Sequence, residues 1–179
     1  MNIACAWHVR EGSVDMEEDD RRLGTAVLRH LLLKGSIGGV RFGPRLQLLI
    51  DDRTPGQREA RRPAGQVYIN LESLWTVFPT RPDRLPSKSA DFPVLDEDEQ
   101  LRVLWSIRLE EIDEVEMGDP YPHLILTLAS GKLLMFCGQD DQYESWQCGI
   151  AYGDPKEPWL VVARPDGGLA IWAPEHFTV

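Results

Sequence analysis

From His123 to Cys137 the chain reads HLILTLASGKLLMFC, which places two apolar runs on either side of Ala129-Ser130-Gly131. Two runs of β-forming residues around a short connection that contains glycine are typical of a β-hairpin. Glycine is suited to the turn because it adopts a positive φ without steric cost. This stretch therefore predicts antiparallel β structure in the second half of the chain.

Similar patterns occur on both sides of this hairpin. The apolar runs 159–163 and 169–173 flank Arg-Pro-Asp-Gly-Gly, and this turn chemistry predicts a C-terminal hairpin within 158–173. Apolar and polar residues alternate over 40–50 around Gly43-Pro44, which indicates two short strands or one bent strand. The stretch 67–78 is also strand-like, since β-branched and aromatic residues dominate it.

Two helices are expected before these strands. The stretch 17–34 has acidic residues at its start and an apolar run towards its end, and we expect Gly35 to end it. A second helix is expected at about 97–106, with Asp96 and Glu99 forming a capping box. The alternation over 107–117 indicates a strand with an irregularity. The predicted fold class is α+β, mainly antiparallel β, with two related sheet-forming halves.

The chain has 179 residues, the length of a single domain, and it contains two similar stretches. We predict pseudo-repeat halves at about 36–78 and 107–146, joined by a crossover at 79–95 that contains four prolines. Each half contains a hairpin that ends in a Glu-Ser-Trp pattern, Glu72-Ser73-Leu74-Trp75 in one and Glu144-Ser145-Trp146 in the other. One hairpin cannot bury its apolar face alone, whereas two packed together can.

These motifs resemble an uncharacterised bacterial β-rich family with a Y-E-x-W motif and a P-x-G-x-x-A-x-W tail. The corresponding residues are Tyr143-Glu144-Ser145-Trp146 and the stretch from Pro165 to Trp172, and the resemblance covers roughly 35–175. It implies a small stand-alone cytosolic protein and, for some members, an immunity protein that acts against a secreted toxin. It implies no catalytic residues.

Charge is unevenly distributed along the chain, whose net charge is −10. Residues 1–90 carry 14 basic and 11 acidic side chains, whereas residues 91–179 carry 5 and 18. An acidic surface repels nucleic-acid phosphates and attracts a basic protein partner, such as a toxin. We therefore expect no nucleic-acid binding and an acidic partner-binding face.

Two segments concentrate the candidate residues for this face. Five acids occur within seven residues around Glu114, and a second acidic cluster lies near Tyr143 and Trp146, whose aromatic rings are rigid anchors for a partner. The predicted partner-binding residues are Glu110, Glu111, Glu114, Glu116, Asp140, Asp141, Tyr143, Glu144 and Trp146.

Other chemistry has weaker support in the sequence. The cluster at 140–144 lacks the ligand spacing of a Ca²⁺ loop, and the four histidines form no metal-binding pair. No phosphate-binding or nucleophile motif occurs, although Ser73 or Ser145 could join a distant His and Asp in a triad. We therefore expect no catalytic residues, cofactor or metal. A carbohydrate or small-ligand groove built from the six tryptophans, and an enzyme with an unrecognised site, stay open as alternatives.

The remaining expectations concern location. Three cysteines without a C-x-x-C pair indicate a reducing compartment, and no apolar stretch is long enough for a signal peptide or membrane span. The leading interpretation is a non-enzymatic cytoplasmic binding module, an immunity protein that blocks a toxin through its acidic face. The sequence does not indicate an oligomeric state.

Overall fold

The computed structural model describes residues 18–52 and 63–177, so Cys5 and most of the arginine-rich loop predicted at 51–66 lie outside the described residues. The helices are α1 (Glu18–Leu32), the short 3₁₀ helix η2 (Ser89–Asp91) and α2 (Glu97–Ser106). The strands are β1 (Gly35–Arg41), β2 (Leu46–Asp52), β3 (Gln66–Leu71), β4 (Trp75–Phe78), β5 (Ile112–Met117), β6 (Leu124–Leu128), β7 (Leu133–Phe136), β8 (Trp146–Ala151), β9 (Leu160–Ala163) and β10 (Leu169–Trp172).

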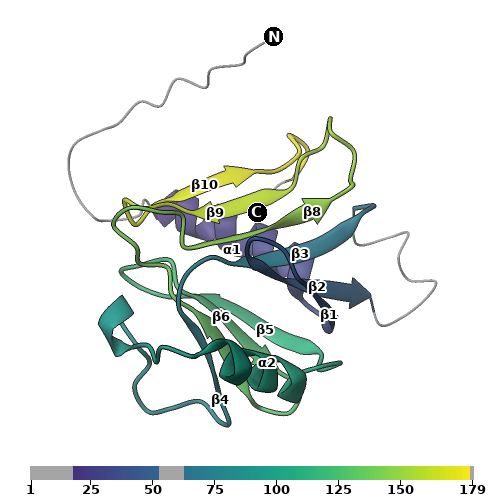
Figure 1. Ribbon diagram of the computed structural model, residues 1–179. Helices are drawn as coiled ribbons and strands as arrows, with labels where there is room; N and C mark the ends of the chain where they lie inside the picture. Colours follow the sequence, from purple (N-terminus) through teal and green to yellow (C-terminus); the bar gives the residue numbers. More distant parts are fainter. Residues whose placement is uncertain (1–17, 53–62, 178–179) are drawn as a thin grey trace.

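The strands form two sheets in which every pair is antiparallel. One sheet has six strands in the order β1-β2-β3-β8-β9-β10, and the other has four in the order β4-β7-β6-β5. Figure 1 shows the six-stranded sheet above the four-stranded one. The predicted α+β class, mainly antiparallel β, is confirmed.

The two sheets exchange a strand with each other. Strands β1, β2 and β3 are neighbours in one sheet, but β4 then joins the other sheet beside β7. Likewise β5, β6 and β7 are neighbours, and β8 then crosses back to pair with β3. The orders β1-β2-β3-β8 and β5-β6-β7-β4 are therefore topologically equivalent. An internal duplication would produce this pattern, although the duplication itself stays a prediction.

The main core lies between the sheets and draws on both halves. It contains Leu48 and Ile69 from the first half and Leu126 and Leu134 from the second, all fully buried. Successive residues of β7 face opposite sides of the four-stranded sheet. The β7 side chains that point away from the main core join a smaller cluster with Phe92 and Leu85 of the crossover. The four-stranded sheet is thus covered on both faces, which explains why β7 is apolar throughout.

Helix α1 connects the two sheets at one side of the core. It packs against β5 of one sheet and against β9 and β10 of the other. The Arg29 side chain of this helix donates from Nε to the Val115 carbonyl at 3.1 Å. Just after the helix, the Lys34 amide donates to the Ile112 carbonyl at 2.8 Å. These bonds satisfy carbonyl groups on the edge of β5, which would otherwise be open to pairing with another strand.

Several local predictions can be compared with the structure. Helix α2 begins with the predicted capping box, in which Glu99 N donates to Asp96 Oδ1 at 2.8 Å and Asp96 N donates to Glu99 Oε2 at 3.0 Å. The irregularity predicted within 107–117 is confirmed as a register shift between Ile112 and Glu114. Gly131 has the positive φ expected of its turn, at 84°.

Two local predictions were wrong. Gly35 does not end the first helix: Lys34 takes the left-handed conformation, with φ 65°, and Gly35 already belongs to β1. The strand-like stretch 67–78 is two strands in different sheets, separated by Glu72-Ser73-Leu74. The second error has a tertiary cause, because β3 and β4 join different sheets.

Candidate functional site

Three of the four predicted acids on and before β5 are paired within the chain. Glu110 Oε1 lies 2.8 Å from Lys132 Nζ, and Glu111 Oε1 lies 3.3 Å from Lys34 Nζ. Glu116 holds the Arg81 guanidinium through both carboxylate oxygens. Only Glu114 is fully exposed among the four. The predicted acidic face is therefore largely neutralised at this strand.

Glu110 has a structural role. Its Oε2 accepts from the Ser130 amide at 3.2 Å, so the carboxylate fastens the β6–β7 turn as well as pairing with Lys132. Burial alone raises the pKa of Glu110, but the hydrogen bonds from Lys132 and Ser130 outweigh it and lower the pKa below its ordinary value. This carboxylate is committed to internal contacts.

The second acidic cluster lies on a rigid loop after β7. Asp140 Oδ1 accepts from the amides of Gln142 and Tyr143, both at 2.8 Å, and this fixes the turn. Asp141, Tyr143 and Glu144 are exposed, with Tyr143 68% exposed. The loop thus presents two carboxylates and an aromatic ring to solvent on a fixed backbone.

This loop forms one wall of a hollow of about 600 Å³, which we call the acidic hollow. The other wall is the β3–β4 link, where Glu72 pairs with Arg45 at 3.3 Å. The described lining contains three carboxylates and no basic side chain. It consists of Glu72, Ser73, Leu74, Ser89, Gln139, Asp140, Asp141, Gln142 and Tyr143.

Four hydrogen bonds hold the acidic hollow in shape. Ser73 Oγ donates to the Cys137 carbonyl at 2.7 Å, and the Cys137 amide donates to the Leu74 carbonyl at 2.8 Å. The Ser89 amide donates to Gln139 Oε1 at 2.7 Å, and the Gly138 amide donates to His123 Nδ1 at 2.8 Å. The β3–β4 link and Ser89 are parts of this site that were not predicted from the sequence, although the link contains one of the two repeated Glu-Ser pairs.

The two acidic groups do not form one face. Glu110 and Glu111 lie beside the β6–β7 turn, because the Ala129 amide donates to the Glu111 carbonyl at 2.9 Å. The loop at 138–145 leaves β7 after Phe136, which pairs with Leu124 at the opposite end of these strands. The structure therefore separates Glu110 and Glu111 from the acidic residues of the 138–145 loop.

Trp146 is not a surface anchor. Its side chain is 0% exposed, and its Nε1 donates to the Pro122 carbonyl at 2.8 Å. It lies at the start of β8, and its large apolar ring packs between the sheets. The prediction that Trp146 contacts a partner was wrong, since no part of the ring reaches solvent. Glu144 beside it stays exposed and accepts from Gln147 Nε2.

The serines of the two Glu-Ser pairs are not arranged as nucleophiles. The Ser73 hydroxyl donates to a backbone carbonyl rather than to a histidine. Ser145 is 0% exposed, and within the described ranges 18–52 and 63–177 its Oγ has no hydrogen-bond partner. Among the residues that the structure describes, no group of three or more His, Cys, Asp or Glu side chains is placed to hold a metal ion.

His123 is the buried titratable group behind the acidic hollow. It is 1% exposed, and its ring lies 5.6 Å from that of Phe92 and 6.0 Å from that of Tyr121. Because Nδ1 accepts from Gly138, the neutral ring carries its proton on Nε2. Burial lowers the pKa of His123, although the Ser87 backbone and the Asp91 charge oppose this shift.

We expect this histidine to make the protein less stable as the pH falls below about 6.5, the ordinary His pKa. Below that pH the unfolded chain takes up a proton that the folded chain resists, so the free energy of unfolding decreases. Protonation also converts Nδ1 to a donor facing the Gly138 amide. Denaturant titrations between pH 7 and pH 5 measure the slope. Below this window the protonation of carboxylates such as Glu110, whose pKa is lowered in the folded chain, also decreases the free energy of unfolding.

His123→Asn is the matched variant for this prediction. The Asn side chain offers a neutral acceptor that does not titrate, so the slope between pH 7 and pH 5 should flatten whatever its stability at neutral pH. Equal slopes for the wild type and His123→Asn would contradict the assignment of this pH dependence to His123.

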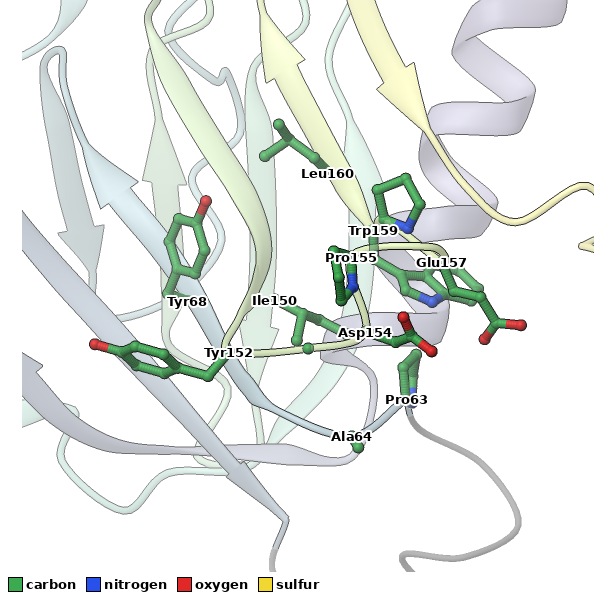
Figure 2. Close-up of a pocket in the computed structure, with 12 residues that line it drawn as sticks. Pro63, Ala64, Tyr68, Ile150, Tyr152, Asp154, Pro155, Glu157, Trp159 and Leu160 are labelled. Atoms are coloured by element: carbon green, nitrogen blue, oxygen red, sulfur yellow. The ribbon is translucent and has the colours of Figure 1, made fainter. Parts of the chain in front are cut away.

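A second hollow of about 500 Å³ lies at the β8–β9 loop and the start of β3, and we call it the aromatic hollow. Figure 2 shows Tyr68 and Tyr152 on one side and Pro155, Glu157 and Trp159 on the other. The remaining lining residues are Pro63, Ala64, Ile150, Gly153, Asp154, Pro158 and Leu160. Of the described tryptophans, Trp105 and Trp172 are exposed, whereas Trp75, Trp146 and Trp159 are buried. Trp159 is the only one of the five in this lining.

No helix among the described residues is long and apolar enough to cross a membrane. Comparison of the chain with protein-family models, with curated proteins and with solved structures finds no match in any of the three.

Proposed function

We propose that the chain is a non-enzymatic binding protein that takes a basic segment of a partner protein into the acidic hollow. The observation that carries this proposal is the composition of the hollow: Asp140, Asp141 and an exposed Tyr143, beside a Glu72 that Arg45 pairs, with no basic side chain in the described lining. Arginine and lysine side chains complement such a surface in charge, and Tyr143 offers them a ring face.

The rigidity of the loop supports the same proposal. Asp140 and the bonds to Ser73, Ser89 and His123 hold the hollow in place before any partner binds. A pre-organised surface loses little conformational entropy on binding, so more of the contact energy is available for affinity. The β5 carboxylates are poorer candidates, since Lys34, Arg81 and Lys132 already neutralise them.

The resemblance to the bacterial family with the Y-E-x-W motif supports a narrower version of the proposal. In that version the chain is a cytoplasmic immunity protein, and the basic segment belongs to a toxin whose active surface the acidic hollow covers. Tyr143 and Glu144 of that motif are exposed beside the acidic hollow. Cys137 is free and buried, in keeping with a reducing compartment.

A fluorescein-labelled hexa-arginine peptide tests the acidic hollow directly. We expect saturable binding that weakens steeply between 50 and 300 mM salt, because exposed charges are screened. The double variant Asp141→Asn, Tyr143→Ala should bind about tenfold more weakly, a loss of about 1.4 kcal/mol. Both residues are exposed, so the fold should be unaffected.

The control is Glu114→Gln, which removes one exposed negative charge on β5 away from the hollow. It should leave the affinity for the peptide within about twofold of wild type, a change of about 0.4 kcal/mol. An equal loss of peptide affinity in Glu114→Gln and in the single variant Asp141→Asn would show that the peptide responds only to net charge. That result, or unchanged binding in the double variant, would refute the proposed site.

A further inference from the structure

The aromatic hollow has no part in the proposed function, yet its composition is unusual for a surface. Tyr152 is 85% exposed, and Tyr68 is half-buried on the outer face of the six-stranded sheet. The cross-strand partner of Tyr68 is Gly149, and the chain at Trp159 packs closely against this glycine. A Cβ at Gly149 would lie 2.7 Å from the Trp159 carbonyl oxygen.

Trp159 provides an unmet hydrogen-bond donor at this hollow. The residue is 7% exposed, its ring stacks on His30 at 4.7 Å, and the Phe177 ring meets it edge-on at 5.1 Å. Its Nε1 is buried and has no hydrogen-bond partner among the residues that the structure describes. Buried polar groups are nearly always paired, so an unpaired indole N–H calls for an explanation.

The position of this nitrogen indicates what would pair with it. In Figure 2 the nitrogen edge of the indole is turned towards the side where Asp154 lies. The His30 ring stacks on the indole, so we expect a ligand to approach at the nitrogen edge. Asp154 is exposed on this side of the ring. A backbone carbonyl group is the acceptor that a peptide presents in every residue.

Charge selects the ligand further. Asp154 and Glu157 are exposed at the rim, and the described lining of the hollow contains no basic side chain. Asp154 Oδ1 accepts from the Lys156 amide at 2.9 Å, which fixes the turn that carries both acids. A cationic side chain next to an apolar segment would match this arrangement.

We propose that the aromatic hollow binds a basic, proline-containing peptide segment in the extended polyproline II conformation. Its proline rings pack against Tyr68 and Tyr152, one of its carbonyl groups accepts from Trp159 Nε1, and its Arg or Lys meets Asp154 and Glu157. Proline-rich segments suit aromatic grooves because they are already extended and lose little entropy on binding. A cationic ligand without an acceptor group would leave the indole N–H unpaired, and a neutral sugar would leave the charge of the two carboxylates unbalanced.

The backbone at Tyr152 provides a variant that separates binding from folding. Tyr152 has φ 62°, a conformation that glycine adopts more easily than any other residue. Tyr152→Gly therefore removes the ring without destabilising this turn. Leu109 has φ 64° and lies outside the hollow, so Leu109→Gly is a matched control for the same backbone change.

The probe is a labelled nine-residue peptide made of three Pro-Pro-Arg repeats. We expect saturable binding to the full chain, at least fivefold weaker binding for a peptide of Ala-Ala-Arg repeats, and none for Pro-Pro-Glu repeats. Tyr152→Gly should weaken binding about tenfold, whereas Leu109→Gly should leave it unchanged. The double variant Asp154→Asn, Glu157→Gln should remove most of the salt dependence.

The indole N–H of Trp159 gives a direct spectroscopic readout. Trp159→Phe identifies its signal in a ¹H–¹⁵N spectrum by the signal's absence, and the wild-type signal should shift downfield as Pro-Pro-Arg peptide is added. Equal binding of the Pro-Pro-Arg and Ala-Ala-Arg peptides, unchanged binding in Tyr152→Gly, or an indole signal that does not move would each overturn the proposal. A saturable shift with maltohexaose but not with peptide would assign the hollow to sugars instead.

The proposals for the two hollows can be refuted independently of each other. The variant Asp141→Asn, Tyr143→Ala should retain binding of the Pro-Pro-Arg peptide, and Tyr152→Gly should retain binding of hexa-arginine. If Asp141→Asn, Tyr143→Ala abolishes binding of Pro-Pro-Arg while Tyr152→Gly does not, the peptide occupies the acidic hollow and the present inference is wrong.

Discussion

Replacing Trp146 with alanine is expected to lower the free energy of unfolding by about 3–5 kcal/mol, the usual cost of removing a large buried aromatic side chain. Trp146 is 0% exposed at the start of β8, between β3 and β9. The variant leaves a cavity in the shared core and removes the hydrogen bond to the Pro122 carbonyl. Denaturant unfolding followed by circular dichroism measures the change.

Two further variants make this prediction specific. Trp172→Ala is the matched control, because Trp172 is 43% exposed at the edge strand β10, and it should cost less than about 1 kcal/mol. Trp146→Phe keeps most of the ring but leaves the Pro122 carbonyl without its donor, so an intermediate loss of about 1–3 kcal/mol is expected. Similar losses for Trp146→Ala and Trp172→Ala would contradict the burial of Trp146.

Gly138→Ala is expected to have the next largest effect, a destabilisation of about 3 kcal/mol from overpacking. A Cβ at Gly138 would lie 2.7 Å from the His123 amide nitrogen and closer still to the Pro122 carbonyl. These are backbone atoms, which cannot move aside as a flexible side chain can. The substitution should also weaken hexa-arginine binding, because Gly138 begins the loop that carries Asp141 and Tyr143.

Gly39→Ala is the control for this substitution. Gly39 lies in β1, and a Cβ there would meet only the end of the Leu49 side chain at 3.8 Å, an ordinary contact. Its stability should stay within about 0.5 kcal/mol of wild type. If Gly138→Ala is as stable as Gly39→Ala and still binds hexa-arginine, the close packing of Gly138 against the 122–123 backbone is not needed.

Local patterns predicted most elements of the fold but not how they pair. The turn at Gly131 and the cap at Asp96 follow from local sequence patterns, although Glu110 also fastens the turn, and both occur where the sequence predicts them. The run 67–78 was interpreted as one strand-like stretch because period-two alternation does not reveal which sheet a strand joins. The break at Glu72-Ser73-Leu74 comes from the exchange of β4 and β8 between sheets.

In the candidate sites, too, the sequence predicted some features and only the structure shows the others. The acidic clusters were visible in the sequence, but the pairing of Glu116 with Arg81, 35 positions earlier, was not. Likewise, the Tyr-Glu-Ser-Trp motif placed Tyr143 and Trp146 together, whereas the structure exposes one and buries the other. Neither hollow was predicted as a site, because the walls of each come from segments far apart in the chain.

The order of residues along the chain determines the strands, the turns, the helix cap and the excess of negative charge in the second half. These features depend on contacts within a few residues, or on composition alone. The tertiary structure decides which carboxylates are neutralised, which aromatic rings reach solvent and where a ligand has room. Those outcomes depend on the packing of two sheets that exchange strands, and such packing brings distant residues together through the burial of the whole apolar core.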